Sequence, residues 1–155
     1  MTGEEMKAYQ LRISQAGVAD LTLVMLEMEM QWIGEALSAY ERQNTEEFIT
    51  CVEKAQAVQV ELMNVMNMEN PLSVEVYSVF VYINKILIRA KLKEQPLDLA
   101  RCSGMLRRYH ESFAQIAHTD TGGPVMVQSE KVYAGLTYGS GGLVESSVGG
   151  VEFKA

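Results

Sequence analysis

The sequence predicts an all-α protein: an antiparallel up-and-down four-helix bundle with a short helical segment before it and a glycine-rich tail after it. Apolar residues recur every three or four positions through four long segments, the spacing of a helix face that packs on other helices. Short connections separate these segments, which favours antiparallel neighbours. The helical pattern stops near His118. We therefore divide the chain into a bundle domain, residues 1–118, and a tail, residues 119–155.

The first fifteen residues carry a short amphipathic pattern. Met6, Tyr9 and Ile13 stand at positions i, i+3 and i+7, which places them near one face of a helix. A helix of this length is only marginally stable by itself in water. We therefore expect it to lean on the rest of the protein.

The next helix, about residues 18–42, is the one around which the chain is organised, because it carries two apolar stripes. The first stripe contains Leu23, Leu26, Met30, Ile33, Leu37 and Tyr40, and the second contains Leu21, Met25, Met28 and Trp32. One stripe is enough to dock a helix on its neighbours, so the second faces either more of the same domain or a partner. Flexible methionine side chains suit a surface that accepts a peptide. Both interpretations stay open at this point.

Three further helices are expected, at about residues 45–68, 71–93 and 96–118. Asn44-Thr45, followed by two glutamates, is typical of a capped helix start, and so is Asn70-Pro71. The third of the four long helices contains the segment VEVYSVFVYI, whose residue types favour a strand. Its apolar spacing nevertheless continues for five helical turns, which is too long for a strand, and we interpret it as a helix.

Composition excludes several classes of function. The formal net charge is −7 and no basic cluster is interleaved with aromatic residues, so nucleic-acid binding is not expected. No apolar run reaches about 18 residues, which argues against membrane insertion. The first residues are acidic and lack the hydrophobic core of a secretion signal. Cys51 and Cys102 stand alone on apolar helix faces, as core thiols in a reducing compartment do. We expect a cytoplasmic protein.

The residue types needed for catalysis or metal binding are not found in a recognisable pattern. A di-iron site in a helix bundle requires Glu-x-x-His on two helices, whereas His110 and His118 both belong to the last helix and neither follows a glutamate at that spacing. We expect both histidines at the surface. Glu27 and Glu29 are two residues apart and face different sides of their helix, so we interpret them as rim charges. No catalytic residue, metal ligand or cofactor is predicted, and the chain is not expected to be an enzyme.

A set of short motifs in a fixed order resembles a known family. The set runs over about residues 6–118 and comprises Ala8-Tyr9-Gln10, Lys54-Ala55-Gln56, Glu61-Leu62-Met63, Met66-Asn67-Met68-Glu69 and Ile88-Arg89-Ala90-Lys91-Leu92-Lys93. In this order the motifs resemble those of the flagellin export chaperone family, FliS. The resemblance implies a cytoplasmic helical bundle that binds the disordered C-terminal segment of flagellin, prevents its premature polymerisation and assists its delivery to the flagellar export gate.

The alternative from another class is a non-enzymatic helical adaptor that self-associates through the second apolar stripe or the tail. Under the chaperone interpretation, the candidate client-binding residues are Met6, Tyr9, Ile13, Leu21, Met25, Met28, Val65, Met66, Val79 and Tyr82. Core packing is the competing role for the last seven. For the first three, the resemblance implies that the N-terminal segment covers part of the client site in the free chaperone.

Overall fold

The computed structural model describes residues 1–119, apart from the side chains of residues 18–19 and 116–119. Over this range the chain forms helices and no strands, which confirms the predicted all-α class. The helices are α1 (Gly3–Gln15), α2 (Val18–Glu41), α3 (Thr45–Asn64), α4 (Pro71–Lys93) and α5 (Leu99–Thr119). The predicted glycine-rich tail lies outside the described residues.

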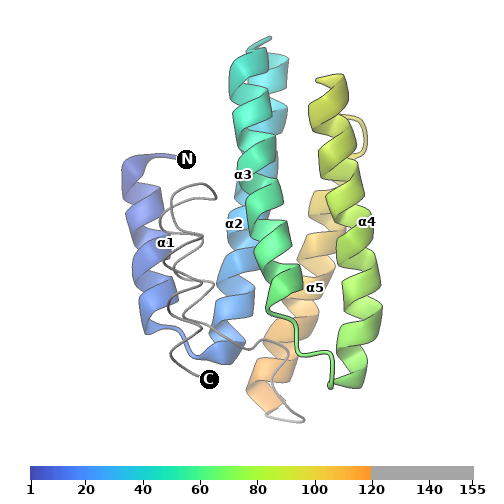
Figure 1. The fold of residues 1–155 in the computed structure, drawn as a ribbon. Helices are drawn as coiled ribbons and strands as arrows, with labels where there is room; N and C mark the ends of the chain where they lie inside the picture. The colour runs from blue at the N-terminus through green and yellow to red at the C-terminus, as the bar shows by residue number, and fades with distance from the viewer. Residues whose placement is uncertain (120–155) are drawn as a thin grey trace, which may run out of the picture.

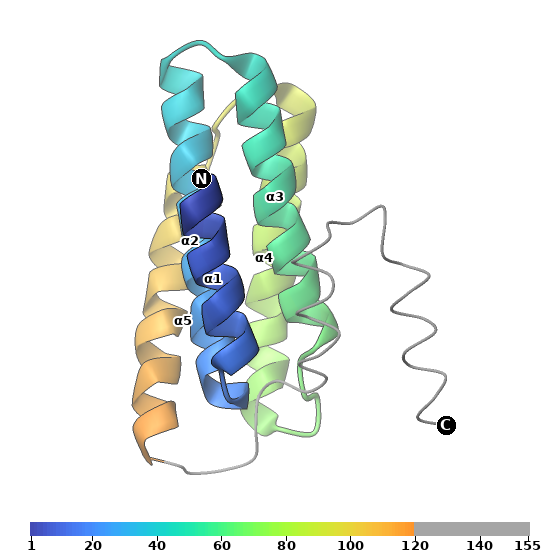
Figure 2. The ribbon, with the colours of Figure 1, turned by 90° about the vertical axis from the view of Figure 1, so that its left-hand side faces the viewer.

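Helices α2 to α5 stand side by side, and successive helices run in opposite directions (Figure 1). Helix α2 packs against both α3 and α5, while α4 packs against α3 and, over a smaller contact, against α5. Helix α1 packs on the outside of α2. The two views together place α1 and α4 on opposite sides of the molecule (Figures 1 and 2).

Side-chain caps set the starts of three helices. At α1, the Thr2 hydroxyl accepts a hydrogen bond from the Glu5 backbone N–H, and the Glu5 carboxylate accepts one from the Thr2 backbone N–H, which is a complete capping box. Asn44 accepts from the Glu47 backbone N–H at the start of α3. Asn70 caps α4, where Pro71 occupies the first turn. The two Asn caps lie where the sequence predicts them.

Two helix ends differ from the prediction. Helix α3 ends at Asn64 rather than near residue 68, and the chain continues through Val65 and Met66, both buried. Helix α5 begins at Leu99 rather than at Pro96. Glu94 and Leu97 adopt positive φ angles of 53° and 41°, so the chain makes a turn there that a helix cannot include.

Helix α2 is covered on three sides, by α1, α3 and α5. Its second stripe is the better buried one: Leu21, Met25 and Met28 are at most 2% exposed. In the first stripe, Leu26 and Ile33 are buried, Leu23, Met30 and Leu37 are partly buried and Tyr40 is exposed. Burying a side chain of this size contributes about 1.5–3 kcal/mol, so the second stripe is a principal part of the core.

The interpretation of Glu29 as a rim charge is wrong, because its side chain is fully buried among α2, α3 and α5. With its amide nitrogen facing the carboxyl, Gln59 of α3 donates to both Glu29 oxygens, at 2.7 and 3.0 Å. Burial raises the pKa of Glu29 well above its ordinary value. Burial, together with the nearby Glu29, also raises the pKa of the Cys102 thiol to about 12, so this cysteine stays a neutral core residue.

Helix α4 is long and apolar enough to cross a membrane by length and composition, with a mean hydropathy of 1.3 over its best window. A helix of a soluble bundle passes the same test, and α4 packs against two neighbours. Much of its outer face stays exposed and apolar, including Val74, Tyr82 and Leu92. These residues are exposed apolar side chains of α4, in addition to the buried face that packs in the core.

Candidate functional site

Helix α1 is held on α2 by a narrow apolar contact. Ile13 is the one side chain of α1 that the described structure buries, at 6% exposure. Met6, Tyr9 and Ala16 are half-buried and pack against the core around it, while Leu11 points away and is 57% exposed. The predicted trio of Met6, Tyr9 and Ile13 therefore forms the inner face of α1.

Three polar contacts accompany this apolar face, and all of them reach α2. The Tyr9 hydroxyl donates to the Gln31 side-chain oxygen at 2.9 Å. Arg12 Nη1 donates to Glu27 Oε2 at 2.5 Å. The amino group of Met1 lies 2.7 Å from Glu35 Oε2. The partners on α2 move backwards along the chain as α1 advances, so α1 lies antiparallel to α2.

These contacts hold α1 only modestly. Exposed ion pairs contribute about 0–1 kcal/mol each, and burying one isoleucine contributes about 1.5–3 kcal/mol. Ordering the helix opposes docking, because fixing each residue costs about 1–2 kcal/mol of conformational entropy before helical hydrogen bonds offset it. By contrast, α2 packs along its length against α3 and α5. Helix α1 is thus packed less extensively than α2 and contacts the bundle chiefly through α2.

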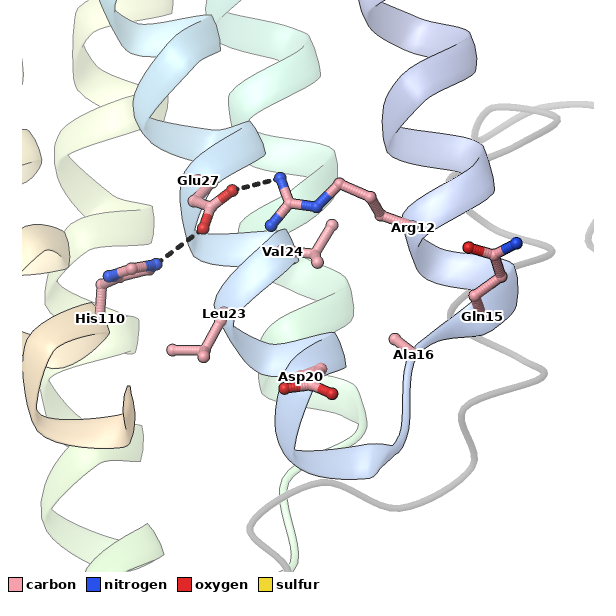
Figure 3. Close-up of a pocket in the computed structure, with 8 residues that line it drawn as sticks. All are labelled: Arg12, Gln15, Ala16, Asp20, Leu23, Val24, Glu27 and His110. Atoms are coloured by element: carbon pink, nitrogen blue, oxygen red, sulfur yellow. Dashed lines mark hydrogen bonds and ion pairs between the residues drawn. The ribbon is translucent and has the colours of Figure 1, made fainter. Parts of the chain in front are cut away.

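Glu27 connects three helices at the centre of this contact. Its two carboxylate oxygens are shared between Arg12 of α1, described above, and His110 of α5, whose Nε2 lies 2.9 Å from Glu27 Oε1 (Figure 3). Burial by itself would raise the pKa of Glu27, but the hydrogen bonds from Arg12 and His110 outweigh it and the pKa is lowered. Glu27 is therefore a stabilised carboxylate, and α1 supplies part of that stabilisation through Arg12.

A cleft of about 310 Å³ opens beside Glu27, where α1 passes into α2 (Figure 3). Its lining combines two apolar side chains of α2 with charged and polar groups of three helices. The lining residues are Arg12, Gln15, Ala16, Asp20, Leu23, Val24, Glu27 and His110. The cleft thus presents apolar walls together with both signs of charge.

The structure separates the other predicted client-binding residues. Leu21, Met25 and Met28 lie in the core, and Val65 and Met66 are buried where α3 leads into α4. A partner could reach these five only if the covering helices moved. Val79 is half-buried and Tyr82 is 42% exposed, but both belong to α4, across the molecule from α1 (Figures 1 and 2). The ten residues thus do not form one continuous surface.

Sequence reasoning missed the polar half of this site. Arg12 stands three residues after Tyr9 and beside Ile13, a spacing that could have marked it as part of the same face. Glu27 was interpreted as an ordinary rim charge and His110 as a surface residue, whereas both are only about 28% exposed and bind each other. No local pattern links residues that are 83 positions apart in the chain.

Nothing in the described part of the chain suggests catalysis. Among the side chains that the structure describes, no group of three or more His, Cys, Asp or Glu could hold a metal ion. Cys51 and Cys102 are both buried free thiols.

The described residues thus form a helical bundle with a terminal helix packed on the outside of α2. Residues 3–120 match the model of the family described as flagellar protein FliS, and the chain therefore belongs to the FliS family. The resemblance drawn from the sequence motifs is thereby confirmed. The family is one of flagellar export chaperones rather than enzymes. No curated protein matches the chain.

Proposed function

We propose that this protein is a cytoplasmic chaperone that binds the disordered C-terminal segment of flagellin, prevents its premature polymerisation and assists its delivery to the flagellar export gate. Flagellin segments that polymerise through apolar faces need those faces covered before export. A helical client can be covered by a bundle that presents an apolar groove. Family membership supports this role, and the described residues offer no competing chemistry.

The observation that carries the proposal is the way α1 sits on α2. An amphipathic helix with one buried side chain, Ile13, occupies a surface edged by Gln31 and Glu27. We propose that α1 is a cover, and that a client helix takes its place on α2. A disordered client loses conformational entropy when it becomes helical on binding, so a broad contact is needed for useful affinity. Removal of α1 adds the apolar surface under Met6, Tyr9 and Ile13 to the cleft.

The deciding experiment mixes the purified chain with a peptide of the flagellin C-terminal segment and follows binding by calorimetry. Saturable binding with one peptide per chain is expected. A reaction followed by light scattering then checks that the chaperone suppresses flagellin polymerisation. Absence of binding at high micromolar concentrations of both components would exclude the proposed role.

The second candidate is a self-associating adaptor, and the exposed apolar residues of α4 favour it. Val74 is 54% and Leu92 is 75% exposed on a helix whose outer face no other described element covers. Such a face can join two copies of the chain. Sedimentation of wild-type protein and of Leu92→Lys tests the adaptor, which should form dimers that the substitution disrupts. Calorimetry with the flagellin peptide tests the chaperone, which should bind its client equally well with and without the substitution.

A further inference from the structure

We infer that the client of this site is selected for a basic side chain that binds Glu27, with a hydrogen-bond donor three residues before it and an apolar residue directly after it. This inference rests on the proposed function, since it concerns what replaces α1. It adds the chemistry by which the surface of α2 recognises its partner.

Departure of α1 would change the surroundings of Glu27. The carboxylate then loses Arg12, its partner at 2.5 Å, and keeps only His110. With α1 in place Glu27 is 28% exposed, and the neighbouring side chains of Leu23 and Val24, which belong to α2 itself, still limit the access of water from one side after α1 leaves (Figure 3). A half-buried charge without its partner is unfavourable. A client that supplies a lysine or arginine removes this cost, and a client that supplies a carboxylate adds to it.

The spacing of the two acceptors on α2 restricts the helix that can bind both. The acceptors Glu27 and Gln31 are four residues apart on α2, which is about one helical turn. Their partners on α1, Arg12 and Tyr9, are three residues apart and face the same way. A second helix lying antiparallel on α2 must therefore carry its donor and its cation at the same separation to satisfy both acceptors.

Apolar side chains of α1 accompany its donor and its cation. Ile13 is adjacent to Arg12 and is the side chain that α1 buries, while Met6 precedes Tyr9 by one turn. Helix α1 thus presents apolar, donor, cation and apolar groups at positions 6, 9, 12 and 13. We take α1 as the template: the partner is an amphipathic helix with this order of groups, running antiparallel to α2.

A double-mutant cycle tests the inference on the full-length chain. Each lysine and arginine of the flagellin C-terminal peptide is changed to glutamine in turn, and each peptide is titrated against wild-type protein and Glu27→Gln. One peptide substitution is expected to weaken binding to wild-type protein by up to about fivefold, the upper end of the range for a part-exposed ion pair, and to change binding to Glu27→Gln less than twofold. The cycle cancels any general gain that comes from loosening α1.

Glu35→Gln is the matched control, because Glu35 also belongs to α2 and also binds α1, through the amino group of Met1. The peptide substitution that weakens binding to wild-type protein should weaken binding to Glu35→Gln by the same factor. The inference is overturned if every basic residue of the peptide contributes equally to both proteins, or if Glu35→Gln removes the difference as Glu27→Gln does. If the unmodified peptide fails to bind wild-type protein at all, the proposed function itself falls and the inference falls with it.

Discussion

Glu29 and Gln59 meet in the centre of the bundle, where the Gln59 amide nitrogen donates to both carboxyl oxygens at 2.7 and 3.0 Å and neither side chain is exposed. Burial raises the pKa of Glu29, so between the ordinary and the raised pKa the folded protein keeps a proton that the unfolded chain releases. The pair ties α2 to α3, and it makes stability depend on pH.

Glu29→Gln should stabilise the protein at neutral pH and should have little effect in acid. Below the unfolded pKa of about 4.5 the wild-type carboxyl is neutral in both states, and its full contribution to stability is present. As the pH rises towards the raised folded pKa, wild-type protein loses stability at up to about 1.4 kcal/mol per pH unit, whereas the amide does not titrate. Urea unfolding at pH 4.5 and pH 7.5 measures the difference.

Glu46→Gln is the control, since Glu46 is exposed on the first turn of α3. The unfolding free energy of Glu46→Gln should change between pH 4.5 and pH 7.5 by the same amount as that of wild-type protein. Parallel pH profiles for Glu29→Gln and wild-type protein would show that Glu29 does not titrate between those limits.

Met28→Asp is expected to unfold the domain about as severely as Leu62→Asp. The sequence leaves Met28 either a client-binding residue, whose substitution would spare the fold, or a core residue, and its 2% exposure places it in the core. Both substitutions place an unpaired carboxylate in the core, which costs several kcal/mol. Leu11→Asp on the exposed side of α1 should stay within about 0.5 kcal/mol of wild-type protein. Thermal melts of the three variants decide the point, and a cooperative melt of Met28→Asp near the wild-type temperature would contradict it.

The sequence predicted the class of the fold, its five helical segments and most of their starts, because caps and apolar spacing act locally. It could not tell which stripe of α2 is the core, since both have the same 3–4 spacing and the answer depends on which helices flank α2. Glu29 was misjudged for the same reason: its partner Gln59 is 30 residues away on another helix. The contact of Arg12 and His110 through Glu27 likewise requires three helices in place.

Arg12→Gln should loosen α1 without destabilising the bundle. It removes the ion pair with Glu27 but leaves Ile13 in its pocket and α2–α5 unchanged. Hydrogen exchange should become several-fold faster in residues 3–15 and stay as in wild-type protein in α3. The pKa of Glu27 is lowered when α1 is docked. The ion pair therefore stabilises the docked helix above the ordinary pKa of about 4.5, and this stabilisation is lost as the pH falls through the lowered pKa.

Acid should therefore accelerate exchange in α1 of wild-type protein towards that of Arg12→Gln, after correction for the intrinsic pH dependence of exchange. Lys7→Gln, a change of charge on the exposed side of the same helix, is the control and should behave as wild-type protein. Equal protection of α1 in all three proteins would mean that the ion pair does not help to hold the helix.

The central claim is that α1 covers the client surface, and deletion of residues 1–14 tests it most directly. A site that is free in a tenth of the molecules binds about tenfold more weakly than one that is always free. Calorimetric titration with the flagellin C-terminal peptide should therefore show up to about tenfold tighter binding by the truncated protein, and Tyr9→Ala should show a smaller gain. Weaker binding by the truncated protein would contradict the account, because α1 would then be part of the client site rather than its cover.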